Sequence, residues 1–268
     1  MTNDIFNEKL FFLSIPLYII VDMPNPTSHL CLVYDLIDTK SDSMVEYLLL
    51  GSITPDIRVI TKTPRKDFHY FDLKNGKKGD GVKNFILKNK YASSKQNNRQ
   101  TRLFLVGYLS HLIADENWTV DVFRKIFMNK EIFPDFNQAL LLDRALQIYL
   151  DLYLYNTNRN IYSYLNNLDL GKIILPSNIN NSDLLKWVDF VSDLNKSFSE
   201  DPWSRLDFMA KRLSNTYESE SILNFCIEFK KNIDKNINEL LEKIPENYID
   251  IYINDTKTSI ENILKELY

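Results

Sequence analysis

Apolar residues recur at steps of three and four positions over several stretches of the chain, which is the period of one face of an α-helix. Residues 26–38, 43–51, 101–118 and 137–155 are predicted to be helices, and the last has apolar residues on most sides, so it is expected near the centre. Another helix is expected over residues 219–243, with one buried or coiled-coil-like stripe made by Ile222, Cys226, Phe229, Ile233, Ile237, Leu240 and Ile244.

The segment "SEDPWSRLDF", residues 199–208, carries a helix-start signal. Ser199 or Asp201 can accept a hydrogen bond as the cap, and Pro202 suits the first helical position. We therefore predict that a helix begins there.

Turn-forming residues gather between residues 52 and 100, in "ITPD", "TKTPRKDF", "KNGKKGDG" and "SSKQNNRQ". They are scarce overall, because the 268 residues include only 6 glycines and 9 prolines, which favours long helices over a sheet with tight turns. We expect an all-α fold, a multi-helix bundle in one domain over residues 1–268. Residues 23–150 would form its core and residues 156–268 a helical C-terminal extension.

The apolar stretch "LFFLSIPLYIIV", residues 10–21, is too short to span a bilayer, and no transmembrane segment is expected. It is interpreted as a buried strand or helix, with a signal peptide or a membrane-surface or partner contact left open. Cys31 and Cys226 stand far apart without CxxC spacing, so neither a disulfide framework nor a thiolate zinc site is predicted. A reducing, cytoplasmic location fits this cysteine use.

Charge argues against one class of partner. The chain mixes 36 acidic with 32 basic residues for a net charge of −4, without a long block of one sign. A protein that holds duplex nucleic acid by its phosphates usually presents a basic face, so no such partner is expected.

The chemistry-bearing residues lie early in the chain. All three histidines, His29, His69 and His111, fall within the first 111 residues. His111 and Asp115 are four positions apart, so on a helix both side chains leave the same face, close enough to bind one ion. Asp56 follows Gly51 and Pro55, where a bent connection lets it point inward. A lone histidine is more often a hydrogen-bonded core residue and a lone Asp56 more often a cap, but an aspartate buried on an apolar helix needs a partner, and a cation would supply one.

Taken in order, "MPxxxxH", "GSITPDIR", "RxxxHxFDL" and "GYLSHLIADExW" resemble the motifs of the zinc-dependent phospholipase C family, all-helical metallohydrolases, over roughly residues 23–150. The resemblance implies that Asp56, His69, His111 and Asp115 bind a first zinc ion, and that His29 joins Asp115, as a bridge, at a second. One to three ions fit the resemblance, and two are expected.

The chain departs from the secreted members of that family in two respects. They use an N-terminal tryptophan and further histidines downstream as ligands, whereas this chain has no tryptophan near His29 and no histidine after His111. Asp121, Asp135 and Asp143 are the nearby carboxylates that could replace the missing ligands. Asp143, Gln147 and Asp151, at four-residue steps, are equally explained as a polar stripe between helices.

The resemblance implies a hydrolase in which metal-activated water attacks a phosphoester or a related ester or amide bond of a small or medium-sized, possibly anionic substrate. We expect Asp56 to be the catalytic carboxylate that orients or deprotonates the water, because it enters from a loop. Arg58 and Arg65, with Lys62, are predicted to bind substrate. Glu116 and Asp72 are candidates to orient histidines, and "KNGKKGDG" is interpreted as a turn or lid. Two alternatives stay open: a non-catalytic binding or scaffold protein with a structural metal, and a tailoring enzyme acting on a carrier-bound or peptide intermediate.

Overall fold

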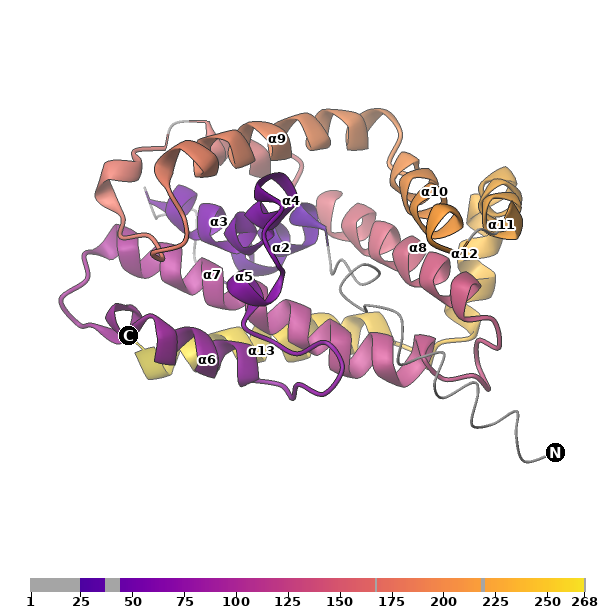
Figure 1. Ribbon diagram of the computed structural model, residues 1–268, viewed down its shortest axis with the longest axis horizontal. Helices are drawn as coiled ribbons and strands as arrows, with labels where there is room; N and C mark the ends of the chain where they lie inside the picture. The colour runs from indigo at the N-terminus through magenta and orange to yellow at the C-terminus, as the bar shows by residue number, and fades with distance from the viewer. Residues whose placement is uncertain (1–24, 37–43, 167, 218–219, 268) are drawn as a thin grey trace.

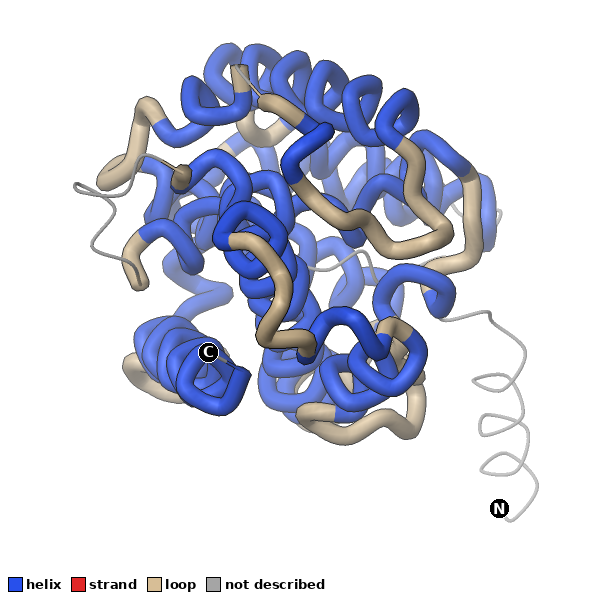
Figure 2. The backbone as a smooth tube through the Cα atoms, turned by 90° about the vertical axis from the view of Figure 1, so that its left-hand side faces the viewer, coloured by secondary structure: helices blue, strands red, loops and turns tan. Residues whose placement is uncertain are grey.

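The computed structural model describes residues 25–36, 44–166, 168–217 and 220–267 (Figure 1). Within these ranges the chain forms helices joined by loops, and no strand occurs among them (Figure 2). The all-α prediction is confirmed. The apolar stretch at residues 10–21 lies outside the described residues.

Helix α7, Arg99–Asn117, runs through the middle of the molecule. It begins where the Asn98 side-chain oxygen accepts a hydrogen bond from the Thr101 amide at 2.8 Å, as an N-cap does. α3, Val45–Ile53, packs along one side of α7, and α13, Tyr248–Leu267, runs beside it on another. From Phe104 to Asn117 every residue of α7 is buried, so its polar side chains face protein rather than bulk water.

The crossing of α3 and α7 depends on two glycines that lie against each other. A Cβ atom added at Gly107 would lie 1.9 Å from the carbonyl oxygen of Leu48, and one added at Gly51 would lie 2.0 Å from the carbonyl oxygen of Phe104. No real Cβ contact is that short, so the two backbones approach as closely as only glycine allows. This crossing sets the distance between α7 and the segment that follows α3.

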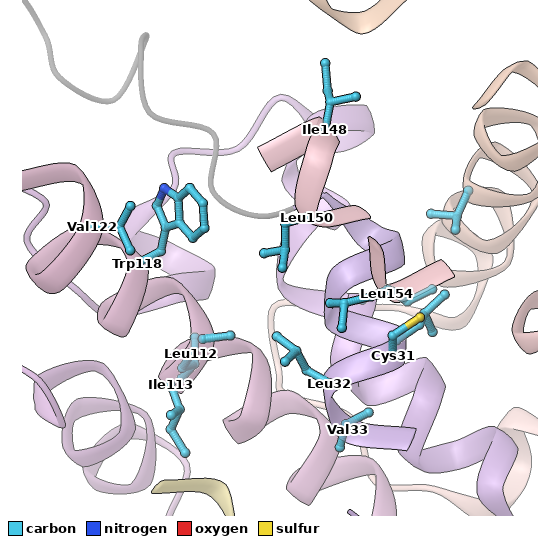
Figure 3. Close-up of a cluster of buried hydrophobic side chains, with 14 of the residues drawn as sticks. Cys31, Leu32, Val33, Leu112, Ile113, Trp118, Val122, Ile148, Leu150 and Leu154 are labelled. Atoms are coloured by element: carbon cyan, nitrogen blue, oxygen red, sulfur yellow. The ribbon is translucent and has the colours of Figure 1, made fainter. Parts of the chain in front are cut away.

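Beyond α7 the chain continues in the wider turns of a π-helix, η4, Trp118–Phe127. Trp118 lies in the apolar core together with residues of α2, Pro26–Tyr34, and α8, Phe136–Tyr155 (Figure 3). The helix predicted for residues 137–155 is confirmed and central. The helix predicted for residues 26–38 ends at Tyr34, and the one predicted to end at residue 118 extends into the π-helix without a break.

The loop-rich segment at residues 52–100 contains several short helices instead of loop alone. These are η2 (Thr54–Ile57), α4 (Arg58–Thr61), α5 (Lys66–His69), α6 (Asp80–Lys88) and η3 (Lys90–Ser93). Left-handed residues separate some of them: Lys62 ends α4 at φ 58° and Tyr70 ends α5 at φ 56°. Each reverses the chain after a single turn of helix, so the segment folds closely over α7.

In the C-terminal half, η5 (Ile161–Leu165) and η6 (Leu170–Lys172) lead to α9, Asn181–Glu200, and α10, Ser204–Tyr217. The helix expected near "SEDPWSRLDF" begins at Ser204. Ser199 instead belongs to the last turn of α9, while the Asp201 side chain accepts a hydrogen bond from the Trp203 amide at 3.0 Å. A helix therefore does begin within this segment, but later than Ser199, because α9 extends through Ser199 and Glu200.

The single helix predicted for residues 219–243 is wrong. Two helices occupy that range, α11 (Glu220–Lys231) and α12 (Ile233–Glu242), separated by Asn232 at φ −146°. The Asn236 side-chain amide donates to the Phe229 carbonyl at 2.8 Å and so satisfies one of the acceptors left open at the end of α11. The predicted apolar stripe is nevertheless buried, apart from Ile233, because each of the two helices packs its apolar face against the core.

No helix among the described residues is long and apolar enough to cross a membrane. Both cysteines are buried free thiols. Burial raises the pKa of Cys226 to about 11, so this thiol is not a reactive nucleophile near neutral pH.

Asp143 of α8 is a buried carboxylate within this fold. It accepts hydrogen bonds from the Trp118 indole at 2.9 Å and from the Gln147 amide at 2.8 Å, and burial raises its pKa to about 7. The pKa of this carboxyl group is near 4 in the unfolded chain and about 7 in the folded protein. The folded protein therefore loses stability as the pH rises from about 4 through 7, because only the unfolded chain releases the proton readily over that range. The folded state therefore tolerates Asp143 better at pH 5 than at pH 8.

We expect Asp143→Asn to raise the free energy of unfolding at pH 8 by about 1–2 kcal/mol and to leave it nearly unchanged at pH 5. The new amide oxygen can still accept the hydrogen bond from Trp118. The new amide nitrogen can donate to the side-chain oxygen of Gln147, Oε1, which is buried without a partner in the wild-type protein. Urea denaturation at the two pH values measures this. Equal destabilisation at both would show that Asp143 is held as a stable ion.

Candidate metal centre

Five side chains from four elements converge around one end of the buried part of α7 that carries His111 and Asp115 and form one cluster. They are the predicted ligands His29 from α2, Asp56 from η2, His69 from α5, and His111 and Asp115 from α7. Four are almost fully buried, while the side chain of Asp56 keeps 19% of its surface exposed. Asp56 is therefore the most exposed member of the cluster, although most of its side chain is buried.

His111 and Asp115 leave the same face of α7, and the His111 Nε2 atom lies 3.7 Å from the Asp115 Oδ2 atom. The other ring nitrogen, Nδ1, lies 2.7 Å from the carbonyl oxygen of Ser52 on α3. Because a carbonyl only accepts, Nδ1 carries the proton, and the Nε2 lone pair points to the cluster. The glycine crossing brings Ser52 to this distance, so the packing of two helices fixes a histidine tautomer.

His69 is placed by the short helix α5. The Tyr108 hydroxyl of α7 donates to the Phe68 carbonyl at 2.7 Å, which ties α5 to α7. The His69 Nε2 atom then lies 3.2 Å from the Nε2 atom of His111, 3.2 Å from Asp115 and 3.3 Å from Asp56. One nitrogen thus faces two carboxylates and a second imidazole.

Asp56 is held in a tight turn instead of the open loop that the sequence suggested. Pro55 is the second residue of the 3₁₀ helix η2, and the Trp187 indole of α9 donates to the Ile53 carbonyl at 2.8 Å just before this helix. This bond anchors the turn from the C-terminal half of the chain. The rigid turn directs the Asp56 carboxylate toward His69.

His29 stacks on His111, with ring centres 3.7 Å apart and planes inclined by 16°. Its Nε2 atom lies 3.4 Å from the Asp115 Oδ1 atom. The neighbouring Ser28 amide donates to Asp151 of α8 at 3.0 Å, which fixes the turn of α2 that carries the imidazole. His29 is therefore near one carboxylate oxygen of Asp115, Oδ1, and His69 is near the other, Oδ2.

The protonation states suit metal binding. Burial, followed by the nearby His29, lowers the pKa of His111 to about 3, so its imidazole is neutral near pH 7. Burial alone would raise the pKa of Asp56 and of Asp115, but the histidines, and for Asp115 also Arg65, outweigh it and hold both pKa values below the usual range. Ionised carboxylates and a neutral imidazole are the forms that ligate metals.

Several atoms in the cluster are buried without a hydrogen-bond partner: both ring nitrogens of His29, Nδ1 of His69 and Oδ1 of Asp115. Each such atom costs about 1–3 kcal/mol. The ligand atoms of His29, Asp56 and His111 lie within 4.8 Å of one another, and so do those of His69, His111 and Asp115. Imidazole nitrogen and carboxylate oxygen are donors that zinc accepts. The residues present therefore fit a metal centre, and the two overlapping sets share His111.

Arg65 and Arg58 lie at different depths. Arg65 is buried and pairs with the Asp115 carboxylate, whereas Arg58 is partly buried with its Nε atom 4.0 Å from Asp56. Arg65 thus sits inside the cluster, where its charge offsets that of Asp115. Lys62 is exposed and donates to the Val59 carbonyl.

The carboxylates considered as replacement ligands lie elsewhere. Asp121 pairs with Lys78 and Lys125, Asp135 caps α8, and Asp143 contacts Trp118. None of the three belongs to either set of ligand atoms found among the described residues.

The two acidic residues proposed to orient histidines have other partners. Glu116 accepts hydrogen bonds from the amides of Gly79 and Gly81 and so anchors the "KNGKKGDG" turn. Asp72 accepts from the Lys74 amide on the surface. The Ser52 carbonyl, a main-chain group without a sequence signature, orients His111 instead.

A cavity of about 380 Å³ opens beside Asp56. Sequence reasoning missed most of its wall, which comes from α9 and α10: Trp187, Phe190, Phe198, Arg205 and Phe208. The stretch "SEDPWSRLDF" had drawn attention only as a helix start, although its arginine and aromatic residues at helical spacing were the available signal.

Residues 42–164 match the family model for zinc dependent phospholipase C. The resemblance is thereby confirmed over that segment, which carries Asp56, His69, His111 and Asp115. His29 precedes the matched segment, and α9 to α13 follow it. Comparisons with curated proteins and with solved structures found no match.

Proposed function

We propose that this phospholipase C-like chain is a zinc-dependent hydrolase that cleaves a phosphoester or a related ester bond. The observation that carries the proposal is the convergence of five ligand-type side chains, with unpartnered buried atoms among them, beside a cavity that reaches Asp56. A cavity of this volume falls within the range of small-molecule sites.

The exposed fraction of each side chain suggests its role. His29, His69, His111 and Asp115 are enclosed and would hold zinc, whereas Asp56 is both near the histidines and open to the cavity. Zinc, when bound, lowers the pKa of water and stabilises negative charge on a substrate oxygen. Asp56, ionised because its pKa is held low, can accept a hydrogen bond from the attacking water and take its proton. Arg58, close to Asp56, is positioned to contact an anionic substrate.

Zinc content and turnover test the proposal together. We expect the purified protein to contain zinc by elemental analysis, to hydrolyse bis(4-nitrophenyl) phosphate, and to lose turnover with a chelator and regain it with added zinc. His69→Ala should lower turnover to the background rate, because His69 faces both carboxylates. The control His69→Gln, with a far-ultraviolet circular dichroism spectrum, separates loss of the ligand from loss of the fold.

Protein without bound metal, or His69→Ala protein with full turnover, would overturn the proposal. Protein with tightly bound zinc but no turnover on phosphoesters, carboxylic esters or amides would favour a scaffold protein with a structural metal.

A further inference from the structure

His111 limits the number of metal ions that the cluster can hold. Its Nδ1 atom donates to the Ser52 carbonyl at 2.7 Å, so Nε2 alone has a lone pair for a metal, and one imidazole nitrogen binds one ion. Both ligand sets found among the described residues contain His111, and the set that does without it keeps two ligand atoms. Zinc sites use three or four protein ligands, so the two sets are alternatives for one ion.

Ring orientation favours the set that contains His69. The rings of His29 and His111 are inclined by only 16°, so their lone pairs, which lie in the ring planes, run side by side and do not converge on one point. The His69 ring is inclined by 66° to that of His111, and the two Nε2 atoms are 3.2 Å apart. Two ligands placed tetrahedrally at about 2.1 Å from one zinc ion are about 3.4 Å apart. His69 and His111 therefore fit a shared ion.

Arg65 places a permanent positive charge in the same cluster. Its side chain is buried, and its Nη2 atom pairs with the Oδ2 atom of Asp115. The same oxygen lies 3.2 Å from the Nε2 atom of His69 and 3.7 Å from that of His111. The guanidinium thus shares the carboxylate oxygen that faces both imidazoles.

The charge of the cluster also favours one ion. Asp56 and Asp115 each contribute a negative charge, histidines that ligate a metal are neutral, and Arg65 contributes a positive charge that it does not release. One divalent ion therefore outweighs the remaining negative charge, and a second would add two more positive charges to a largely buried space. Excess charge of one sign is strongly unfavourable where the dielectric constant is low.

We propose that the cluster binds a single zinc ion through His69, His111 and Asp115, and that Arg65 serves as a second, permanent cation on Asp115. The inference rests on the proposed function for the identity of the metal. It narrows the four enclosed residues of that proposal to three direct ligands, with His29 stacked against His111. Two ions are expected from the sequence resemblance, so a count of bound zinc decides between the two expectations.

Zinc titration of the full chain tests the count and the ligands. The protein is stripped with a chelator, dialysed, and titrated with zinc in competition with a chromophoric chelator, and elemental analysis after gel filtration gives the bound zinc per chain. We expect one tightly bound ion per chain. His29→Ala should retain it with an affinity within about threefold of wild type. His69→Ala should lower the affinity at least about a hundredfold, because a direct ligand is lost.

Substitution of Arg65 tests the second cation. Arg65→Gln should tighten zinc binding at least about tenfold, because repulsion between the guanidinium and the ion is removed. Arg65→Lys, which keeps the charge, should stay within about threefold of wild type. The matched control is Arg159→Gln at an exposed position, and it should change nothing. Zinc should raise the midpoint of thermal denaturation more in Arg65→Gln than in wild type, since zinc then takes over the pairing of Asp115.

Two tightly bound zinc ions in the wild-type chain overturn the inference, and turnover by that protein would leave the proposed function intact. Loss of the ion in His29→Ala, or weaker zinc binding by Arg65→Gln, also overturns it. If zinc-free Arg65→Gln protein does not fold, the wild-type count and Arg65→Lys still decide, and an affinity of Arg65→Lys more than about tenfold below wild type contradicts a role for charge. One bound ion without turnover on any ester or amide would support the inference and remove the proposed function.

Discussion

Replacing Gly107 with alanine is expected to destabilise the protein by about 3–5 kcal/mol or to prevent folding. Alanine is the better helix former by about 1 kcal/mol, so propensity alone predicts the opposite sign. The new methyl would lie 1.9 Å from the Leu48 carbonyl oxygen, and a main-chain atom cannot move aside as a flexible side chain can. α3 and α7 must then separate along the crossing.

Urea denaturation of Gly107→Ala measures this effect, and Gly171→Ala is the control. At Gly171 the nearest contact of an added Cβ is an exposed side-chain oxygen at 3.3 Å, and the expected change is within about 1 kcal/mol. Gly51→Ala should resemble Gly107→Ala, and the double variant should cost less than the sum, because the helices have already parted. A stability of Gly107→Ala equal to wild type would refute the close crossing.

Asp56→Asn is expected to lower kcat about a thousandfold, which is the size of effect that follows the loss of a general base. The variant should still bind at least one zinc ion. An amide cannot accept the proton of water near neutral pH. The set formed by His69, His111 and Asp115 is unaltered by this change, so at least one ion should remain by elemental analysis. KM should change little if Asp56 acts on water rather than on substrate.

The exposed Asp250 provides the matched control for Asp56, as Asp250→Asn makes the same chemical change away from the cluster. It should keep full activity and metal content. Asp56→Asn protein with wild-type kcat would assign proton transfer to another group. Loss of all metal in that variant would instead make Asp56 an indispensable ligand.

Local rules account for the placement of three of the predicted ligands. Four-residue spacing placed His111 and Asp115 on one helix face, and proline placed Asp56 at a tight turn. Which nitrogen of His111 faces the other ligand-type side chains could not be predicted, since it is decided by the main-chain carbonyl of Ser52, which any residue at that position would supply. Likewise, Arg65 was expected to bind substrate because it lies between two predicted ligands, Asp56 and His69, in the sequence, whereas the structure pairs it with Asp115, fifty positions away, inside the cluster.

Helix existence was more predictable than helix limits. The apolar stripe of residues 222–244 continues through Asn232, and periodicity alone has no means of detecting a break that keeps the stripe buried. The cavity was the largest omission. Its arginines and aromatic residues come from three helices, and only tertiary packing shows that they share one space with Asp56.

Asp151 bears on where an independently folding unit could be cut from this chain. The aspartate lies inside the segment that matches the family, but its partners do not: Ser28 precedes that segment and Arg205 follows it. A fragment limited to residues 42–164 would contain the Asp151 carboxylate, which is fully buried in the whole chain, without its donors Ser28 and Arg205. The fragment would also lack His29. The segment that matches the family model is therefore not an autonomous folding module, and truncation studies should retain α2 and α10.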